Sequence, residues 1–575
     1  MCTQWVKKVQ PQAAESIVAY IHENVDLDPV AIKVLLHRHF LSPHEIEKFI
    51  NPRIEDLYDP FLLKGMRDAV CVLEETIAQR KRILIHGDYD MDGVTSTALL
   101  SRVFRKLNVD HLTYIPDRLT EGYGLSREAI DYAVREHVSL IVTVDCGTSA
   151  FEEVDYANSL GLKVLITDHH RPSSDTLPHA VAVINPWQAG GTYPCKELTG
   201  VGIAFKLAQA LTSKVDSDVL DLVALGTVGD VANIVDENRI FVAEGLKVFE
   251  KKTNVGLAAL RNVCGIGTRK ISASDLGYTL GPRINATGRL GSAKNALNLL
   301  LTEDKVEAQQ YALILNDENE ERKRIERQIL DEALAKVEAE VAVDTDRAIV
   351  IWDSKWHQGV IGIIASRLVE RFHKPTMVIA IENNHVCKGS GRSIKGIDLF
   401  GALTACSEAL IEFGGHEYAA GFEIAEERLQ EFRARMNDCI RERYPNGAFQ
   451  KEIEVDLEIT FYDINKMLVR HLNFFKPFGR GNPKPVFLTR HLKLISVPTR
   501  LRGGGAKFSL SDGAIIYDAI WFKPNGFDFK QGISYDILYS LSFDTWFGFE
   551  KIILEIKEMK ESDKVCVIEE ASSHE

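Results

Sequence analysis

The stretch Lys163-Val-Leu-Ile-Thr-Asp-His-His170 decides how this chain folds, because an apolar run passes directly into three side chains that can bind a metal. Two earlier stretches repeat the arrangement: Arg82-Ile-Leu-Ile-His86 leads into Gly87-Asp-Tyr-Asp-Met-Asp-Gly93, and Leu140-Ile-Val-Thr-Val144 leads into Asp145. Apolar runs of this length, alternating with helical segments, predict the βαβ units of a mostly parallel sheet. Ligands bind beyond the carboxyl ends of the strands in such sheets, so we expect these three strand ends to form one site.

The side chains at the strand ends indicate which cation the site would hold. Carboxylate and imidazole ligands favour a hard or borderline cation such as Mn²⁺ or Mg²⁺ over a metal bound by thiolates. An alternative is that the Asp-rich loop only caps a helix. An EF-hand is excluded, because the later ligands and the closing Glu are missing. Every second residue of the first loop is a candidate ligand, a period that points side chains to one side of an extended chain: His86, Asp88, Asp90 and Asp92.

Length and composition describe an ordinary multidomain protein. A chain of 575 residues is expected to hold about three or four domains, each large enough to bury a core. The hydrophobic fraction of 45% and the charged fraction of 26% are typical of globular proteins. The formal net charge of −14 excludes a uniformly basic coat for nucleic acid, but it allows a local basic groove.

The N-terminus and the cysteines bear on where the protein works. The first residues lack the apolar core of a signal peptide, and no apolar run approaches the ~18 residues of a membrane span. The nine cysteines are scattered without a Cys-x-x-Cys pair, which predicts reduced thiols. We therefore expect a cytoplasmic location.

Composition and periodicity divide the chain into six segments. No Gly or Pro occurs between Thr302 and Val341, a stretch rich in Glu, Lys, Arg and Ala that predicts one long helix. A second α/β pattern begins at Ala348, and alternation between Glu452 and Ile459 predicts strands of a small β-barrel. The predicted segments are 1–75, an N-terminal helical region; 76–301, the parallel-sheet domain; 302–343, the connecting helix; 344–446, the second α/β domain; 447–560, the barrel; and 561–575, a disordered tail.

Seven motifs make the chain similar to the DHH phosphoesterase superfamily, and within it to the RecJ family of bacterial single-strand-specific DNA exonucleases. They occur in the family's order between about residues 80 and 425, and residues 477–483 extend the likeness. The resemblance implies a DHH domain, a DHH-associated domain and an oligonucleotide-binding barrel. The motifs are His86-Gly-Asp-Tyr-Asp-Met-Asp-Gly93, Val144-Asp-Cys-Gly147, Asp168-His-His170, Gly226-Thr-Val-Gly-Asp-Val-Ala232, Gly281-Pro-Arg-Ile-Asn-Ala-Thr-Gly-Arg289, Gly389-Ser-Gly-Arg-Ser393 and Gly414-Gly-His416.

The resemblance further implies a centre for two cations. Asp145 resembles the carboxylate that bridges the ions, and His169 and Asp230 resemble ligands of the second ion. Asp168 and His170 flank the ligating imidazole, and they are expected to orient it or to contact the scissile phosphate. By themselves, Asp230 could be a helix cap and His170 a surface residue. The implied metal ligands are His86, Asp88, Asp90, Asp92, Asp145, His169 and Asp230, and the implied catalytic residues are Asp90, Asp92, Asp145, His169 and His170.

The expected chemistry follows from the charge of a phosphodiester, which repels an anionic nucleophile. Two cations ~3.5–4 Å apart can neutralise that charge and supply a nucleophile from water at neutral pH. A structural zinc site would close at four ligands, fewer than the sequence offers. No Ser or Cys nucleophile is required, and the chain has no Gly-x-Ser-x-Gly motif.

The substrate contacts are expected in the second half of the core. Ser390 and Arg392 lie in a glycine-rich stretch that admits a phosphate close to the backbone, and the planar guanidinium can grip it. Arg283 and Arg118 are similar to family positions that hold phosphates, including a 5′ end, and His416 is expected to contact the substrate. The alternatives are structural ion pairs for the arginines and a simple turn for His416.

The barrel is expected to hold the single strand through basic and aromatic side chains. The glycine loop around Gly503-Gly-Gly505 is the better candidate for contact with the DNA backbone, because aromatic residues in barrels usually belong to the core. The aromatic candidates for base stacking are Phe474, Phe475 and Phe478, which lie among Lys476 and Arg480. On this interpretation, removing the barrel weakens the capture of long DNA without removing the chemistry. The basic residues of the loop are Arg500, Arg502 and Lys507.

Together these features predict a monomeric, metal-dependent 5′→3′ exonuclease that hydrolyses single-stranded DNA in recombination and repair. By resemblance, a single-strand-binding protein and a recombination helicase are expected partners. One alternative is a DHH phosphodiesterase for short RNA or cyclic dinucleotides, although the long chain and the barrel argue against it. Another is an inactive single-strand-binding replication scaffold, against which the complete ligand set argues.

Overall fold

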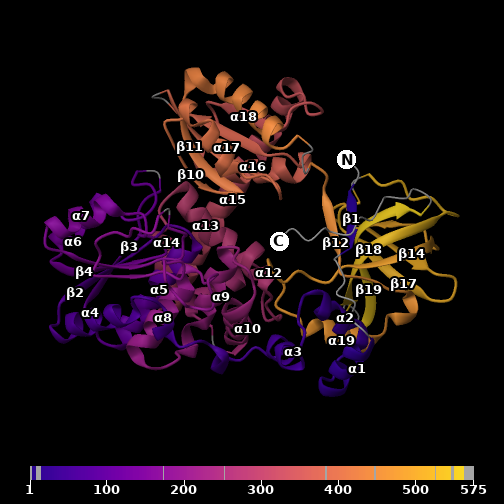
Figure 1. Cartoon of the computed structure of the whole chain (residues 1–575), viewed down its shortest axis with the longest axis horizontal. Coiled ribbons are helices and arrows are strands. Elements are labelled where there is room, and N and C mark those ends of the chain that lie inside the picture. The colour runs from indigo at the N-terminus through magenta and orange to yellow at the C-terminus, as the bar shows by residue number, and fades with distance from the viewer. Residues whose placement is uncertain are drawn as a thin grey trace.

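The computed structural model of the chain forms three domains (Figure 1). In that view the first α/β domain lies at the left, the second α/β domain lies above it, and the barrel lies at the right. The predicted tail lies outside the described residues from position 563 onward. No described helix is long and apolar enough to cross a bilayer. The structure describes residues 3–7, 15–118, 120–172, 174–251, 253–382, 385–445, 449–524, 526–544 and 549–562.

The first α/β domain is built on a five-stranded parallel sheet with the strand order β3-β2-β4-β5-β6. Successive residues of a strand face opposite sides of the sheet. Ile83 and Ile85 therefore pack in one core with α5 and α8, whereas Leu84 packs in the other with α6 and α7. The strands are β2 Arg82–Gly87, β3 His111–Tyr114, β4 Val138–Val144, β5 Lys163–Thr167 and β6 Ala182–Ile184; the helices are α5 Met91–Lys106, α6 Arg127–Arg135, α7 Phe151–Ser159 and α8 Gly200–Thr212.

The strand order reverses between β2 and β4, which makes their carboxyl ends the topological switch point where α/β proteins bind ligands. A helical layer completes this domain around the switch point. One of its segments is a five-residue π-helix, a rare element that is frequent at functional sites. The layer comprises α4 Met66–Ala78, α9 Leu220–Gly229, α10 Asp236–Lys251, α11 Val255–Val263, α12 Ala273–Asp275, the π-helix η4 Leu276–Leu280, α13 Gly281–Leu290 and α14 Lys294–Leu301.

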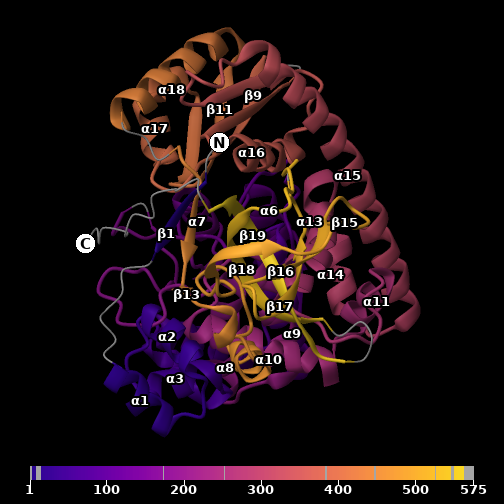
Figure 2. The same ribbon diagram turned by 90° about the vertical axis from the view of Figure 1, so that its right-hand side faces the viewer.

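The predicted long helix is α15, Lys305–Glu340, whose 36 residues span about 54 Å at 1.5 Å per residue. Figure 2 shows it running along one side of the molecule between the two α/β domains. Its N-terminal half packs Ala308, Ala312 and Leu315 into the first core. Its C-terminal half packs Ile329 and Val337 into the second. One continuous helix therefore sets the spacing of the two domains.

The second α/β domain holds a mixed sheet in the order β10-β11-β9-β8-β7, in which only β7 and β8 run parallel. Helix α16 contacts β8 and β9 and also faces α15. The strands are β7 Ile349–Asp353, β8 Thr376–Ile381, β9 Val386–Arg392, β10 Glu412–His416 and β11 Ala419–Ala425; the helices are α16 Gln358–Phe372, α17 Leu399–Ala405 and α18 Leu429–Arg443.

The predicted barrel is present. Strands β14, β18, β19, β17 and β16 form a closed ring, because β14 pairs with both β16 and β18. Phe475, an aromatic candidate for DNA stacking, is fully buried in its core, whereas Phe474 is 47% exposed. The elements are β12 Glu452–Val455, β13 Leu457–Glu458, α19 Lys466–Asn473, β14 Phe487–Leu494, β15 Thr499–Arg500, β16 Ala506–Ser511, β17 Ile516–Trp521, β18 Ser534–Asp544 and β19 Lys551–Glu561.

The N-terminal region is shared between two cores. Helices α1 Glu15–Asn24, α2 Pro29–His37 and α3 Pro43–Ile50 pack in the core of the barrel, whereas α4 packs in the first α/β domain. The first described residues are a strand rather than a helix: β1, Gln4–Lys7, pairs in parallel with β12. This two-stranded sheet is separate from the ring of the barrel, and Trp5 of β1 packs against Leu488 of β14 and Leu538 of β18.

Candidate metal centre

The loop after β2 places its carboxylates at the switch point. One oxygen of Asp90 caps α5, accepting hydrogen bonds from the backbone N–H groups of Asp92 and Gly93 at 2.9 and 3.1 Å. A Cβ on Gly93 would lie 2.4 Å from the carbonyl oxygen of Asp88, so the turn requires glycine. The cap and the ligand interpretations of this loop are compatible, because Asp90 keeps its second oxygen for a cation.

The strand ends bring the predicted ligands together in three groups whose ligand atoms lie within 4.8 Å of one another. Asp145, which follows β4 with a left-handed φ of 64°, belongs to two of them. One of its oxygens lies 3.1 Å from Nε2 of His169, and this nitrogen lies 3.8 Å from a carboxylate oxygen of Asp92. The groups are Asp88, Asp90 and Asp145; Asp92, His169 and Asp230; and Asp145, His169 and His170.

Unpartnered polar atoms support a cation at these groups. Oδ1 of Asp88, Oδ1 of Asp145 and Nε2 of His169 are buried without a hydrogen-bond partner. A buried polar group of this kind is costly unless something compensates it. Because carboxylate and neutral imidazole suit divalent cations such as Mn²⁺ or Mg²⁺, the residues present fit such ions.

The pKa values of the carboxyl groups show how much negative charge the site concentrates. Burial and the neighbouring carboxylates raise the pKa of Asp92 to about 7. The same two causes raise the pKa of Asp145 and of Asp230 well above the ordinary range. Like charges in one buried site oppose ionisation, and positive charge from cations would reverse this effect.

The two histidines of the Asp-His-His motif have opposite protonation states. Burial and the charge of His170 lower the pKa of His169 to about 3, which keeps its imidazole neutral and able to ligate. Burial opposes the charge on His170, but its 2.7 Å hydrogen bond to Asp168 outweighs burial and raises the pKa to about 9. His170 therefore carries a positive charge beside the centre.

Asp168 holds the turn instead of joining a ligand group. One of its oxygens accepts hydrogen bonds from the backbone N–H groups of His169 and His170 and from the His170 ring. The other oxygen accepts from the backbone N–H of Thr148 at 2.9 Å. With both oxygens occupied, Asp168 orients the two imidazoles.

The N-terminus of α8 supports Asp92, a contribution that the sequence analysis missed. The two oxygens of Asp92 accept hydrogen bonds from the backbone N–H groups of Gly200 and Val201 at 2.6 and 2.9 Å. A Cβ on Gly200 would lie 2.6 Å from the Cβ of Asp145. Small residues at the start of an apolar helix are common, so the sequence does not distinguish Gly200 from others. Only its contacts with Asp92 and Asp145 in the folded structure identify its role.

His86 and Asp230, two predicted metal ligands, differ in whether they join a ligand group. His86 is fully buried and stacked on Tyr114 at 5.6 Å between ring centroids; its Nε2 has no partner, but it belongs to none of the three groups. Asp230 is the C-cap residue of α9, and it also contributes an oxygen to a ligand group. The ligand role of His86 stays a prediction.

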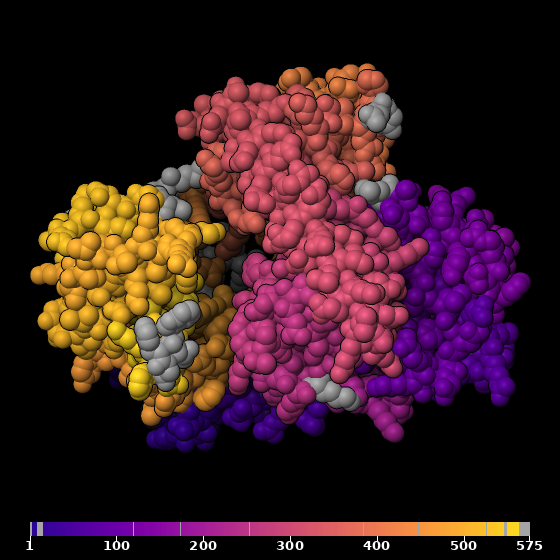
Figure 3. Space-filling model, turned by 180° about the vertical axis from the view of Figure 1, so that it is seen from behind, coloured from indigo at the N-terminus to yellow at the C-terminus, as the bar shows by residue number. Residues whose placement is uncertain are grey.

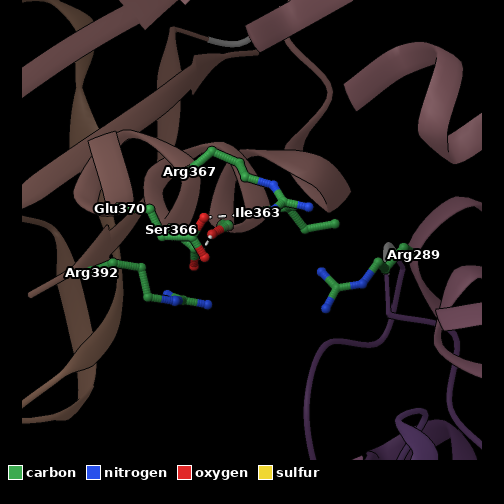
Figure 4. Close-up of a pocket in the computed structure, with 7 residues that line it drawn as sticks. Arg289, Ile363, Ser366, Arg367, Glu370 and Arg392 are labelled. Atoms are coloured by element: carbon green, nitrogen blue, oxygen red, sulfur yellow. Dashed lines mark hydrogen bonds and ion pairs between the residues drawn. The ribbon is translucent and has the colours of Figure 1, made fainter. Parts of the chain in front are cut away.

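A pocket lined by three arginines and one carboxylate, named the anion pocket below, lies between the two α/β domains. It has a volume of about 160 Å³ and is lined by residues of both domains. In Figure 4, Arg289 of the first domain and Arg392 of the second point toward each other across it. Burial and the charges of other arginines, Arg118 first, lower the pKa of Arg289 to about 10. The lining residues are Arg289, Gly362, Ile363, Ser366, Arg367, Glu370 and Arg392.

Tyr89 connects this pocket to the metal centre. The guanidinium of Arg118 lies 5.2 Å from the centroid of the Tyr89 ring, and Tyr89 itself stands between the ligands Asp88 and Asp90. A Cβ on Gly288, the residue before Arg289, would lie 2.6 Å from the Tyr89 carbonyl oxygen. The segment that carries Arg289 therefore packs against the loop that carries the ligands Asp88 and Asp90.

Some of the predicted substrate residues lie near the anion pocket or the metal centre, and one of them, Arg283, does not. Ser390 accepts a hydrogen bond from Arg392 at 3.1 Å, and His416 lies at an exposed strand end within electrostatic range of His169 and His170. Arg283 instead donates to the Thr279 carbonyl and to Asn316, away from the pocket. Of the residues that line the pocket, the sequence predicted only Arg392 as a substrate contact; the polar lining residues that it did not indicate are Arg289, Ser366, Arg367 and Glu370.

Models of known protein families match all three domains. The DHH family N-terminal domain matches residues 82–227, the DHHA1 domain matches residues 345–442, and the RecJ OB domain matches residues 455–558. The parallel sheet with acidic strand ends, the long helix and the mixed second sheet thus define a DHH-type phosphoesterase.

Curated relatives narrow this class. The single-stranded-DNA-specific exonuclease RecJ of Bacillus subtilis (strain 168) is 36% identical over 95% of this chain and 70% of the relative. The RecJ exonucleases of Salmonella typhimurium and Escherichia coli are each 36% identical over 87% of this chain and 91% of the relative. The chain belongs to the RecJ family of single-stranded-DNA-specific exonucleases.

Solved structures agree with this assignment. RecJ from Thermus thermophilus in complex with Mn²⁺ superposes with a TM-score of 0.83 and 30% identity, covering 97% of this chain and 79% of that one. The same protein in complex with Mg²⁺ gives a TM-score of 0.78 at 28% identity. The predicted cofactors, Mn²⁺ or Mg²⁺, are therefore those bound by a structural relative.

Proposed function

We propose that this chain hydrolyses single-stranded DNA from the 5′ end with a two-cation centre. The observation that carries the proposal is the anion pocket, to which each α/β domain contributes arginine side chains, together with its link to the carboxylate cluster. The link is Tyr89, which lies between Asp88 and Asp90 and whose carbonyl packs against Gly288, the neighbour of Arg289. A terminal phosphate held in this pocket would fix how far into the strand the scissile bond lies. Fixed spacing from one end is what makes a hydrolase an exonuclease.

The ligand groups suggest the role of each side chain. Asp145 belongs to two of the ligand groups and lies 3.1 Å from His169, a member of the remaining group, which fits a carboxylate shared by two ions. Asp88 and Asp90 would complete one site, and the group of Asp92, His169 and Asp230 would hold the other. When bound, two divalent cations neutralise the phosphodiester and activate water for in-line attack.

The remaining polar residues of the centre would bind and orient the strand. Protonated His170 lies beside the ligands and can donate to a phosphate oxygen. Arg289 and Arg392 can form charge-assisted hydrogen bonds to a terminal phosphate, about twice as strong as neutral ones. His416 would approach the substrate from the second domain.

The barrel offers a surface suited to the rest of the strand. A cavity of about 610 Å³ lies beside the predicted basic glycine loop and includes Arg500 and the 63% exposed Phe522. Figure 3 shows a hollow between the barrel and the α/β domains, wide enough in that view to separate their surfaces. The basic and aromatic side chains around the cavity beside the glycine loop support sequence-neutral binding of a single strand.

The test compares long single strands with short substrates. Purified protein with Mn²⁺ is given 5′-labelled strands and, separately, dinucleotides and cyclic dinucleotides. Preferred digestion of the long strands supports the proposal, whereas preferred cleavage of dinucleotides supports the short-substrate phosphodiesterase, and binding without cleavage supports a scaffold. Roles in recombination and repair, a monomeric state, and partnership with a single-strand-binding protein and a helicase stay predictions from the family resemblance.

A further inference from the structure

The motif at residues 477–483, singled out in the sequence, forms a contact between the barrel and the metal centre. The carbonyl of Arg480 accepts a hydrogen bond from the backbone N–H of Ile234 at 2.7 Å. Ile234 belongs to the loop that follows Asp230, a member of a cation-ligand group. In Figure 1 the first domain and the barrel approach each other beside α10 and α12.

Glycines make this approach possible. A Cβ on Gly479 would lie 2.7 Å from a side-chain carbon of Ile234. Gly481 adopts a left-handed φ of +73°, and its Cβ would lie 3.1 Å from Asn233. Both positions therefore require a residue without a side chain, and the loop is fitted to the segment after Asp230.

Two buried polar side chains, Arg239 and Asn482, hold the segment of residues 474–482 through hydrogen bonds to its backbone. Arg239 of α10 is buried and donates to the carbonyls of residues 474–477 and to that of Phe49. Asn482 is also buried and donates to the carbonyls of Phe475 and Pro477, while its own oxygen accepts from Arg38. A loop held by this many bonds has little freedom to move.

The side chain of Arg480 is exposed, and it forms no ion pair with the residues that the structure describes. Its charge nevertheless acts on Asp230 at the centre and on Tyr418, in the turn of the second domain next to His416. The backbone bond to Ile234 thus places Arg480 of the barrel beside the segment of the first domain that follows Asp230.

We propose that Arg480 is a substrate-positioning residue that grips a backbone phosphate on the 3′ side of the scissile bond. This inference rests on the proposed function: the 5′ end occupies the pocket of Arg289 and Arg392, the strand crosses the cations, and it leaves past Arg480 toward the barrel. A guanidinium at this point would hold both flanks of the scissile phosphate in register with the cations. The barrel then contributes to the chemical step as well as to the capture of the strand.

The test measures single-turnover cleavage of a long 5′-phosphorylated strand with Mn²⁺ at saturating protein. Arg480→Ala is expected to lower the maximal rate by tenfold or more, and Arg480→Lys to recover part of the loss. The matched control is Arg470→Ala, an exposed barrel arginine that pairs with Glu550 at 2.8 Å, and it is expected to cleave like the parent. Mn²⁺ affinity by calorimetry and the melting temperature are expected to be unchanged in all three variants.

Substrates with one neutral linkage provide a second readout. A methylphosphonate is placed at successive linkages on the 3′ side of the first scissile bond. One position is expected to slow the parent but not Arg480→Ala, because that phosphate's partner is already missing in the variant. An unchanged maximal rate, or a loss of Mn²⁺ affinity that accounts for the lost activity, would overturn the inference. A parent protein that cleaves no strand would instead overturn the proposed function and the inference with it.

Discussion

At the residue scale, Asp145 is the side chain that two of the three ligand groups share. It approaches His169 at 3.1 Å and shares a ligand group with Asp88 and Asp90. Its backbone is left-handed, which for a residue other than glycine is uncommon and tends to persist where the surroundings enforce it. A Cβ on Gly200 would lie 2.6 Å from the Asp145 Cβ, so glycine at this position leaves the space that Asp145 occupies.

We expect Asp145→Ala to abolish cleavage without unfolding the protein. Removing a carboxylate from a repulsive cluster leaves the metal-free fold at least as stable, while both cations lose a ligand. The measurement is the cleavage rate at saturating Mn²⁺ together with the melting temperature in EDTA. A rate within about tenfold of the parent, on the order of 1.4 kcal/mol in the barrier, would show that Asp145 does not bridge the ions.

The two arginines of the Gly281–Arg289 motif offer a direct comparison. Arg289 lines the anion pocket, whereas Arg283 is bonded to Thr279 and Asn316. We expect Arg289→Ala to lower kcat/KM on 5′-phosphorylated strands by roughly 10- to 100-fold, since a hydrogen bond to a charged group is worth about 1.5–3 kcal/mol. Strands with a 5′-hydroxyl should show a smaller loss. Equal losses from Arg283→Ala and Arg289→Ala would remove the pocket from the account.

At the scale of elements, three strand ends and one helix N-terminus hold the carboxylates of the centre in a buried cluster. Burial and mutual repulsion raise the pKa of Asp92 to about 7, and they also raise the pKa values of Asp145 and Asp230 well above the ordinary range. A carboxyl group whose pKa is raised by folding binds its proton more tightly in the folded state. Its contribution to stability is complete below the unfolded pKa of about 3.9, and it is lost as the pH rises through the folded pKa.

The metal-free protein should therefore lose stability as the pH rises from the unfolded pKa of about 3.9 through the folded pKa of Asp92, about 7. Divalent cations replace the protons, so Mn²⁺ should raise the melting temperature more at pH 8 than at pH 5. Thermal unfolding in EDTA and in Mn²⁺ across this range tests the prediction. A stabilisation by Mn²⁺ that does not depend on pH would indicate that the cluster is not where the ions bind.

The sequence predicted those features of the centre that lie in one local segment. Each apolar run and the ligands that follow it are contiguous, so the sheet, the strand ends and the long helix α15 could all be expected. The support of Asp92 by Gly200 and the choice of Arg289 over Arg283 depend on how distant elements pack. The pairing of β1 with β12 joins residues more than 400 positions apart, and no periodicity within either segment indicates its partner.

At the scale of the whole molecule, the barrel is joined to the catalytic domain more tightly than a separable strand holder would be. Helices α1 to α3 complete its core, and Arg239 inserts a buried guanidinium between the domains. Deletion of residues 447–575 would expose both. We therefore expect the truncated chain to lose cleavage rate and melting temperature together, instead of only weakening the capture of long DNA as the sequence alone suggested.

Point substitutions can separate DNA holding from folding. Replacing Arg500, Arg502 and Lys507 by Ala should raise KM for long strands with little change in kcat, because these residues contact the strand equally before and during the reaction. If each neutralises one phosphate, the slope of log affinity against log salt should fall by about 2. An unchanged KM and salt slope would show that the glycine loop of the barrel does not hold DNA.

The central claim, that the chain degrades single strands from the 5′ end, is tested most directly by end-labelled DNA. A long single strand carries the label at its 5′ end in one reaction and at its 3′ end in another, with Mn²⁺ and excess substrate. The 5′ label should leave in the earliest small product, while the 3′ label stays on progressively shorter strands. Early release of the 3′ label, or internal fragments from both substrates, would contradict the account.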